Sequence, residues 1–262
     1  MEHNWESIAA DSNEVAFNGG KMNHIFTPGK GVYEQTFSCD AAQRCFEDPS
    51  SVATLKVHGE CCLLTRQPKS ETDDFEWIFC TRHDSKAKPP PEDAIAVPPG
   101  VHPAKYGKHA YCFLPLDRNK VMGKGMKNTK VGPDTYAAIA AGVANGDLPD
   151  PNGPNCPNHI AVEWVGRKHQ GNVDNLDVDH GLYIHGSTIV DIPERSREAI
   201  ERMAHNVSIE GVVFYDRVTG ERFKLRLDMF EGSMFTKNCK QPVTPESTTI
   251  KPKVIVTEAT NE

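Results

Sequence analysis

The chain has 262 residues, enough for one large domain, and with 38% hydrophobic and 25% charged residues it has the composition of a globular protein. No apolar run approaches the roughly 18 residues that a membrane-spanning helix needs, and the polar start MEHNWESIAADSNE lacks the pattern of a secretory signal. We therefore expect a soluble intracellular protein, of the cytoplasm or nucleus, without a membrane partner. Eight scattered cysteines without a C-x-x-C pair argue against a disulfide scaffold and indicate reduced thiols.

The elements predicted in chain order mix strands with helices. Residues 1–35 are polar and Gly-rich and are expected to form an irregular arm. Two strands with a turn near Gly59 follow in 51–66, SVATLKVHGECCLLTR, and a third strand in 75–82, FEWIFCTR. A proline-rich loop then precedes a helix over 132–146, which proline opens and glycine closes.

The second half of the chain has the same mixed character. Residues 159–166 and 181–190 are strand-like, and 192–205 form the clearest helix. A hairpin follows, with strands in IEGVVFYD and ERFKLRLDMF joined by a turn at RVTG. The tail, 240–262, has little to pack and is expected to be flexible. Hairpins without regular βα alternation indicate an α+β fold, with one domain over residues 36–239.

The net charge of −7 is unevenly distributed along the chain. Residues 101–130, a basic insertion in the domain, contain seven Lys or Arg and a single acid, Asp117, so this segment carries +6 and the remainder −13. A local positive field of this kind is typical of a phosphate-backbone contact, and a solvated lysine-rich loop explains it equally well. The lysines expected to contact nucleic acid are Lys120, Lys124, Lys127 and Lys130.

A set of polar residues along the predicted strands has a chemically suggestive order. Each alone has an ordinary explanation, such as an exposed strand lysine or an edge carboxylate. Together they suit covalent nucleotidyl transfer, because a lysine amine that attacks an α-phosphorus needs cations beside it and a carboxylate to hold a divalent metal. In chain order these residues are Lys56, Arg82, Glu163, Glu210, Lys224 and Arg226.

Four short motifs resemble the lysine-AMP nucleotidyltransferase superfamily, and within it the ATP-dependent RNA ligases. KVHG is similar to the nucleophile motif, usually Lys-x-Asp-Gly, which has histidine in some phage-type RNA ligases. VEWVG, EGVV and FKLR are similar to the nucleoside, metal and final lysine motifs. EWVGRKHQGNVDNLDVDHGLYIHG, and the Cys-Cys after KVHG, also resemble a eukaryotic and viral 5′–3′ RNA ligase group. The resemblance covers about residues 51–230 and is specific only in combination.

The resemblance implies an adenylation domain of antiparallel sheets with flanking helices around a central nucleotide cleft, and no OB domain. It implies that Lys56 is the nucleophile and that Lys224 and Arg226 are catalytic cations on the phosphates. Glu210 and Glu163 would hold the metal. The residues that it places at the nucleotide, besides these three cations, are His58, Gly59, Arg82, Glu163, Tyr183 and His185.

The expected activity is ATP-dependent RNA ligation. With Mg²⁺ or Mn²⁺, Lys56 would take AMP from ATP and pass it to the 5′-phosphate of an RNA end. A 3′-hydroxyl would then displace AMP, and no obligate protein partner is expected. Three alternatives stay open: a capping-type guanylyltransferase or other polynucleotide ligase, a non-catalytic nucleic-acid-binding protein on this scaffold, and a metalloprotein using Cys156 and His159.

Several positions depart from the family pattern or allow two interpretations. Leu55 stands where these ligases commonly have a purine-contacting glutamate, and Cys61 stands where phage-type enzymes have asparagine. Arg226 replaces a lysine, and its planar fork binds phosphate but does not shuttle protons. His58 either bonds the nucleotide or the leaving pyrophosphate, or stabilises the turn. Tyr183 either stacks on the adenine or packs in the core.

Overall fold

The structure of the chain is a computed structural model. It describes residues 22–84, 91–95, 111–119, 131–167, 169–170, 172, 174, 176–216, 219–235 and 250–256. Outside the described residues lie residues 1–21, most of the tail and the four lysines expected to contact nucleic acid, Lys120, Lys124, Lys127 and Lys130. The predicted mixture of strands and helices is confirmed. Within the described part, no helix has the length and apolar character that crossing a membrane requires.

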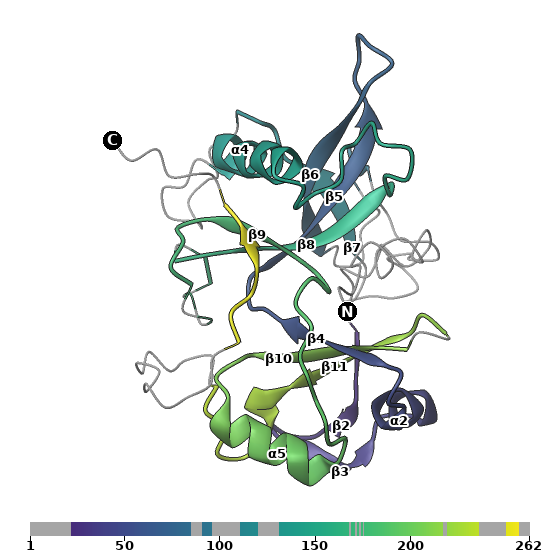
Figure 1. The fold of residues 1–262 in the computed structure, drawn as a ribbon, viewed down its shortest axis with the longest axis vertical. Helices are drawn as coiled ribbons and strands as arrows, with labels where there is room; N and C mark the ends of the chain where they lie inside the picture. Colours follow the sequence, from purple (N-terminus) through teal and green to yellow (C-terminus); the bar gives the residue numbers. More distant parts are fainter. Residues whose placement is uncertain are drawn as a thin grey trace.

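Four strands form the lower sheet of Figure 1, in the order β1–β11–β10–β4. β10 pairs antiparallel with both β4 and β11, while β1 runs parallel to β11. Helices α2 and α5 and the small β2–β3 sheet share one hydrophobic core with this sheet. The bounds are β1 Asn23–His24, β2 Phe26–Pro28, β3 Tyr33–Phe37, α2 Asp40–Glu47, β4 Val52–Lys56, α5 Arg197–Asn206, β10 Gly211–Tyr215, β11 Arg222–Arg226 and a 3-10 turn, η2, Leu227–Met229.

Six strands form the upper sheet, in the order β12–β9–β8–β5–β6–β7, and each is antiparallel to its neighbours. Helix α4 packs against this sheet through a second core, which includes Ala138 and Ile139 of the helix and Phe79 and Trp164 of the strands. The bounds are β5 Glu60–Pro68, β6 Phe75–Asp84, β7 Tyr111–Pro115, α4 Val131–Ala144, β8 His159–Val165, β9 Gly181–Ile184 and β12 Val254–Ile255.

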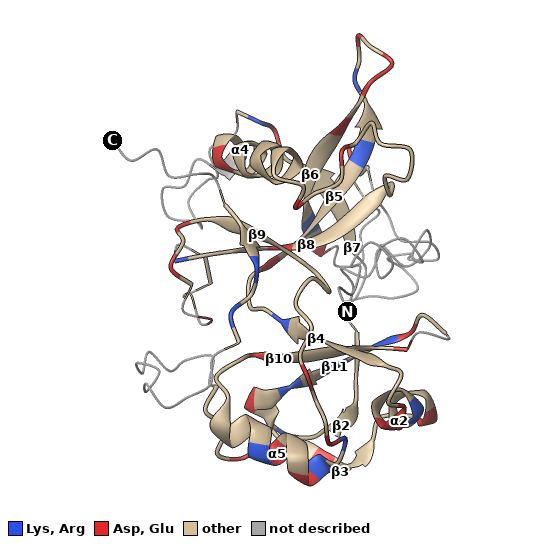
Figure 2. Cartoon of the chain, in the orientation of Figure 1, with Lys and Arg blue, Asp and Glu red and all other residues tan. Residues whose placement is uncertain are grey.

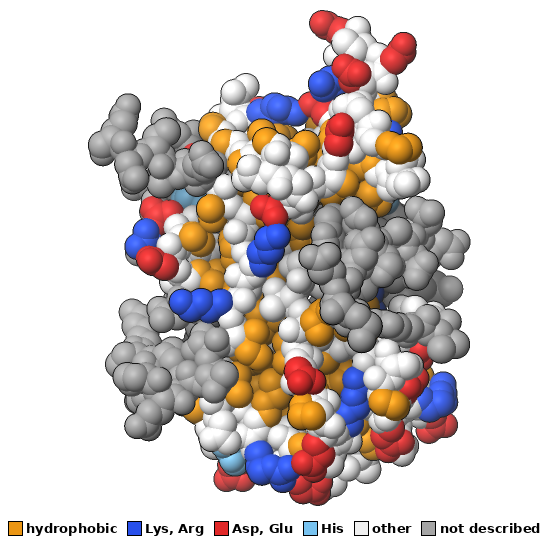
Figure 3. Space-filling model, in the orientation of Figure 1, with side chains coloured by type: hydrophobic (Ala, Val, Ile, Leu, Met, Phe, Trp, Pro, Cys, Tyr) orange, Lys and Arg blue, Asp and Glu red, His pale blue; other side chains and the backbone are white. Residues whose placement is uncertain are grey.

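Side-chain alternation explains how the lower sheet separates a core face from a polar face. In β11, Phe223 and Leu225 are buried in the lower core, and the alternate residues Arg222, Lys224 and Arg226 are only partly buried. Successive strand residues point to opposite faces, so the cations of this strand share the other face. In Figure 3, acidic and basic side chains are visible over the β5–β6 turn at the top, over α5 at the bottom and at several places between them.

Most predicted elements are confirmed with shifted ends. The two strands around Gly59 are β4 and β5, the 132–146 helix is α4, and the last hairpin is β10–β11. Helix α5 begins at Arg197 rather than 192, because the Ser196 side chain accepts a hydrogen bond from the Ala199 amide and caps it there. Strand β7, inside the basic segment, was not predicted.

The structure differs from the expected irregular arm and flexible tail. Over residues 22–35 the chain forms β1, β2 and the start of β3, and Phe26 and Tyr33 are buried in the lower core. Near the other end, β12 pairs with β9 and Ile255 is buried. Strands of two or three residues are too short to show an alternating pattern in a sequence. They are stabilised by pairing with strands that are distant along the chain.

Candidate active site

A cleft of about 530 Å³ lies between the two sheets. Strands β4, β10 and β11 of the lower sheet line one side, and β5, β6, β8 and β9 of the upper sheet line the other. Most residues predicted at a nucleotide line this cleft: Lys56, Gly59, Arg82, Glu163, Tyr183, His185 and Lys224. His58, Glu210 and Arg226 are not among the lining residues. Glu210 contacts the cleft residue Lys56, and His58 lies beside Glu210.

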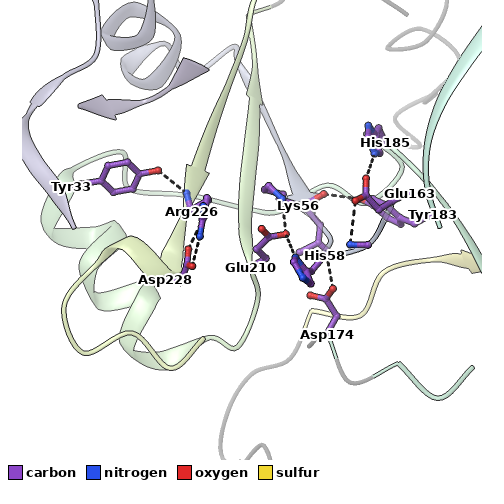
Figure 4. A network of polar contacts seen from close by, with 12 residues as sticks. Tyr33, Lys56, His58, Glu163, Asp174, Tyr183, His185, Glu210, Arg226 and Asp228 are labelled. Carbon is purple, nitrogen blue, oxygen red and sulfur yellow. Dashed lines mark hydrogen bonds and ion pairs between the residues drawn. The ribbon is translucent and has the colours of Figure 1, made fainter. Parts of the chain in front are cut away.

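Lys56, the last residue of β4, is held by a buried carboxylate. Its Nζ donates to Glu210 Oε2 at 2.5 Å, and His58 Nδ1 lies 3.6 Å from the same oxygen (Figure 4). The Glu210 side chain is 2% exposed and the Lys56 side chain 21%. Burial alone would raise the pKa of Glu210, but the hydrogen bond from His58 and the charge of Lys56 outweigh it and lower this pKa to about 2. Glu210 is therefore a fixed negative charge beside the amine.

Asp174 extends this network on the other side of His58. The His58 backbone N–H donates to Asp174 Oδ2 at 2.7 Å (Figure 4). Burial raises the pKa of Asp174 to about 6, and the nearby negative charge of Glu210 raises it further. The hydrogen bond from the His58 N–H lowers this pKa but does not offset the other two effects. Sequence reasoning missed Asp174, because 116 residues separate it from His58 and no local spacing connects the two.

Glu163 ties the turn after β4 to the end of β9. Its Oε1 accepts from the Gly59 N–H at 3.2 Å, and its Oε2 lies 2.9 Å from His185 Nε2 (Figure 4). A Cβ at Gly59 would lie 2.5 Å from the Trp164 carbonyl oxygen and 2.7 Å from Glu163 Cγ. Glycine is therefore required where this turn meets β8, and the close approach brings the turn within reach of the carboxylate.

Tyr183 belongs both to the cleft wall and to the core. It lines the cleft, yet its side chain is almost fully buried and its hydroxyl donates to the Leu55 carbonyl oxygen at 2.9 Å. Burial raises the pKa of this phenol far above its ordinary value. The hydroxyl joins β9 to β4, one residue before Lys56, and so connects the two sheets at the site.

The partly buried face of β11 carries three cations at alternate positions, Arg222, Lys224 and Arg226. Blue segments mark basic positions along this strand in Figure 2. Arg222 and Lys224 line the cleft. Arg226 is held outside it by Asp228, with Nε–Oδ1 at 2.9 Å and a second guanidinium nitrogen 2.5 Å from Oδ2 (Figure 4). The structure therefore distinguishes two cations that the sequence motif places side by side.

The pKa of His24 is affected by the positively charged side chains of the site. It pairs with Lys224 across β1 and β11, and its Nδ1 lies 2.6 Å from the Tyr33 hydroxyl. Burial, and then the charges of Lys224, Arg226 and Lys56 against that of Asp228, lower the pKa of His24 to about 4. Three cations thus act together on one imidazole, a field that favours an anionic ligand.

The upper wall of the cleft adds a further cation and a thiol. Arg82 Nε donates to Asp84 Oδ1 at 2.9 Å, and its guanidinium lies 5.5 Å from the Tyr111 ring centre. Cys61 lines the cleft while Cys62 is buried in the upper core, as expected of neighbours on a strand. Burial raises the pKa of the Cys61 thiol to about 12, so it is not a nucleophile at neutral pH.

The carboxylates of the site suit a cation that takes few protein ligands. Among the described residues, no group of three His, Cys, Asp or Glu side chains is placed to hold a metal. Glu163 and Glu210 belong to separate hydrogen-bond networks, so a cation beside either residue would have a single carboxylate ligand from the protein. Mg²⁺ keeps several waters and binds through one or two carboxylates plus substrate phosphates. Glu163 lines the cleft and fits that pattern, whereas Glu210 is 2% exposed and is covered by its ion pair with Lys56. Of the alternative metal-binding pair, Cys156 and His159, the histidine Nδ1 lies 3.2 Å from the Thr65 hydroxyl oxygen.

Sequence reasoning also missed two further cleft residues, Arg222 and Tyr215. Arg222 stands two positions before Lys224, so strand alternation from Lys224 was the available signal.

Comparison of the chain with protein-family models gives no match, and comparison with curated proteins gives none either. A function for this protein therefore has to be argued from the cleft itself.

Proposed function

We propose that the protein is an ATP-dependent RNA ligase that works through a covalent lysyl-AMP intermediate. The observation that carries this proposal is the Lys56 amine, which stands at a cleft beside a buried carboxylate and further cations. The cleft volume, about 530 Å³, falls within the range typical of small-molecule sites. A lysine paired with a buried acid away from any cleft would have a structural role. Lys56 instead lines a cleft together with Arg82 and Lys224.

In the first step, Lys56 Nζ attacks the α-phosphorus of ATP. The Lys56 ammonium first gives up one proton to solvent. A nitrogen–phosphorus bond then forms with release of a second proton, the bond to the pyrophosphate oxygen breaks, and pyrophosphate leaves. Glu210 aims the amine through its 2.5 Å contact, and Lys224 neutralises charge on the phosphates. Glu163 and Glu210 are the carboxylates that would hold a divalent cation, and its charge would neutralise the phosphates.

In the later steps AMP passes to RNA and is then displaced. A 5′-phosphate oxygen attacks the phosphorus of lysyl-AMP, the nitrogen–phosphorus bond breaks, and the amine regains both protons from solvent. A 3′-hydroxyl then attacks the 5′-phosphorus, its proton passes to solvent, and AMP leaves. Lys56 and Arg226 both lie opposite Gly211 in the sheet register, so Arg226, which is paired with Asp228, lies across β10 from the amine. The basic segment 101–130 would guide RNA ends to this site.

The direct test is covalent labelling. The protein is incubated with Mg²⁺ and ATP labelled at the α-phosphorus, denatured, and examined for bound label. We expect label on the wild type and on Lys69→Ala, a control at an exposed lysine in the β5–β6 turn, and none on Lys56→Ala. An unlabelled wild type, or a labelled Lys56→Ala, contradicts the mechanism and favours the non-catalytic binding protein.

Two further measurements separate the related enzymes. Labelling with GTP in preference to ATP would identify a capping-type guanylyltransferase instead. Joining of RNA that carries a 5′-phosphate and a 3′-hydroxyl, compared with DNA of the same sequence, tests the polynucleotide. A protein that labels with ATP but joins only DNA is not an RNA ligase.

A further inference from the structure

Arg222 is a cation of the cleft that the steps above do not use. Its guanidinium lies 4.7 Å from the Tyr215 ring centre, and both residues line the cleft. Its Nε is buried and has no hydrogen-bond partner in the part of the chain that the structure describes. Other cations of the cleft differ: Lys56 pairs with Glu210, and Arg82 pairs with Asp84.

An uncompensated guanidinium in a desolvated position is unfavourable by itself. Burial lowers the pKa of Arg222, and the nearby Tyr215 hydroxyl opposes this only in part. A neutral side chain would pack on the tyrosine ring without the desolvation penalty that a charge carries. The guanidinium lies against this ring, and its N–H donors have the fork geometry that matches phosphate.

The sheet register separates Arg222 from the reacting amine. Lys56 lies in the row of Gly211, Lys224 in the row of Val213, and Arg222 in the row of Tyr215. Successive rows are two residues apart, or about 7 Å along the strand, so Arg222 starts about 14 Å from the row of Lys56. A phosphate at Arg222 is therefore not the one that Lys56 attacks.

We propose that Arg222 binds a second phosphate group in the cleft, distinct from the α-phosphate at Lys56. The chemistry is that of a phosphate anion, supplied either by the outer phosphates of ATP or by the RNA strand. This inference rests on the proposed function for its location in the reaction. Its central claim, that the cleft holds an anion at Arg222, is measurable without catalysis.

The experiment compares Arg222→Gln and Arg222→Lys with the wild type and with Arg202→Gln. Arg202 is the matched control, an exposed arginine on α5 paired with Glu194. Binding is measured by calorimetry for inorganic triphosphate and for 5′-phosphorylated RNA, with 5′-hydroxyl RNA as the uncharged-end comparison. Thermal unfolding of each variant is recorded alongside.

We expect Arg222→Gln to weaken binding of one anion about 10- to 100-fold, because a charge-assisted hydrogen bond is lost. Arg222→Lys should lose less, since it keeps the charge without the fork. If ATP is the source, triphosphate binding weakens and the KM for ATP in labelling rises. If RNA is the source, labelling is unchanged, and RNA binding and joining of pre-adenylylated RNA weaken.

Three results would overturn the assignment. Arg222→Gln could bind both anions as tightly as the wild type does, or the wild type could bind neither anion. In the third, the unfolding temperature falls in Arg222→Gln and is restored in Arg222→Lys, while anion binding is unchanged. The last would show that the arginine serves packing. A wild type that binds an anion through Arg222 but takes no covalent label refutes the ligase and leaves the phosphate site standing.

Discussion

Replacing Glu210 by glutamine isolates the charge that holds Lys56. Glu210 is buried, and its pKa falls from an ordinary 4.5 to about 2 because His58 and Lys56 outweigh the effect of burial. At about 1.4 kcal/mol per pKa unit, this shift corresponds to about 3 kcal/mol of folding free energy at neutral pH. We expect Glu210→Gln to lose about this amount, and also to abolish productive labelling of Lys56.

The pH dependence of that loss is fixed in sign. A carboxylate with a lowered pKa contributes stability above its unfolded pKa, near 4.5, and loses it as pH falls toward about 2. The difference in unfolding free energy between wild type and Glu210→Gln should therefore be constant from pH 8 to about 7, where Asp174, whose pKa is about 6 in the wild type, stays ionised in both proteins. Below pH 4.5 it should shrink.

Urea unfolding followed by tryptophan fluorescence at several pH values measures this difference. Glu194→Gln is the matched control, because Glu194 is 60% exposed and pairs with Arg202 on the surface, where such pairs contribute at most about 1 kcal/mol. A Glu210→Gln variant within about 1 kcal/mol of the wild type at pH 7 would refute the reasoning. So would a difference that does not shrink in acid.

Two other substitutions test the parts that position this site. Gly59→Ala places a Cβ 2.5 Å from the Trp164 carbonyl oxygen, so we expect a loss of about 3 kcal/mol in thermal or urea unfolding. Gly31→Ala, which has open space but a φ of 91°, should lose only about 1 kcal/mol, and equal losses would contradict the steric account. Asp174 has a raised pKa, about 6 against an ordinary 3.8, so its contribution is present below pH 3.8 and lost as pH rises through 6. Asp174→Asn should therefore be more stable than the wild type by about 3 kcal/mol at pH 7.5, with the gap closing near pH 4 in urea titrations.

The candidate site was partly predictable because strands present alternate residues on one face. A lysine at the end of a strand and two cations two residues apart are local patterns, and the cleft contains Lys56 and Lys224 as expected. Arg226 fits the same local pattern but not the same cleft, because Asp228, two residues on, holds its guanidinium. Local spacing specifies the face of a strand, and side-chain pairing then selects which residues of that face remain available.

The contacts made across long sequence separations were beyond prediction from spacing. Asp174 meets the turn after Lys56 through a loop, and Ile255 near the end of the chain completes the edge of the upper sheet. Residues 22–35 looked irregular because their strands are short and their apolar residues few, yet Phe26 lies in the lower core. Such segments acquire strand structure only when a partner strand satisfies their backbone groups.

By itself the sequence determined the mixed α+β composition, the main strands and helices, and the positions of the charged residues along them. Hydrophobic periodicity, glycine and helix caps are local, and they act within a few residues. Tertiary structure alone decided that two sheets enclose a cleft, that Glu210 is buried against Lys56, and that the Arg222 Nε lies buried there without a hydrogen-bond partner among the described residues. The physical reason is that burial and pairing set a group's charge state and availability, and both depend on neighbours that the chain brings together only on folding.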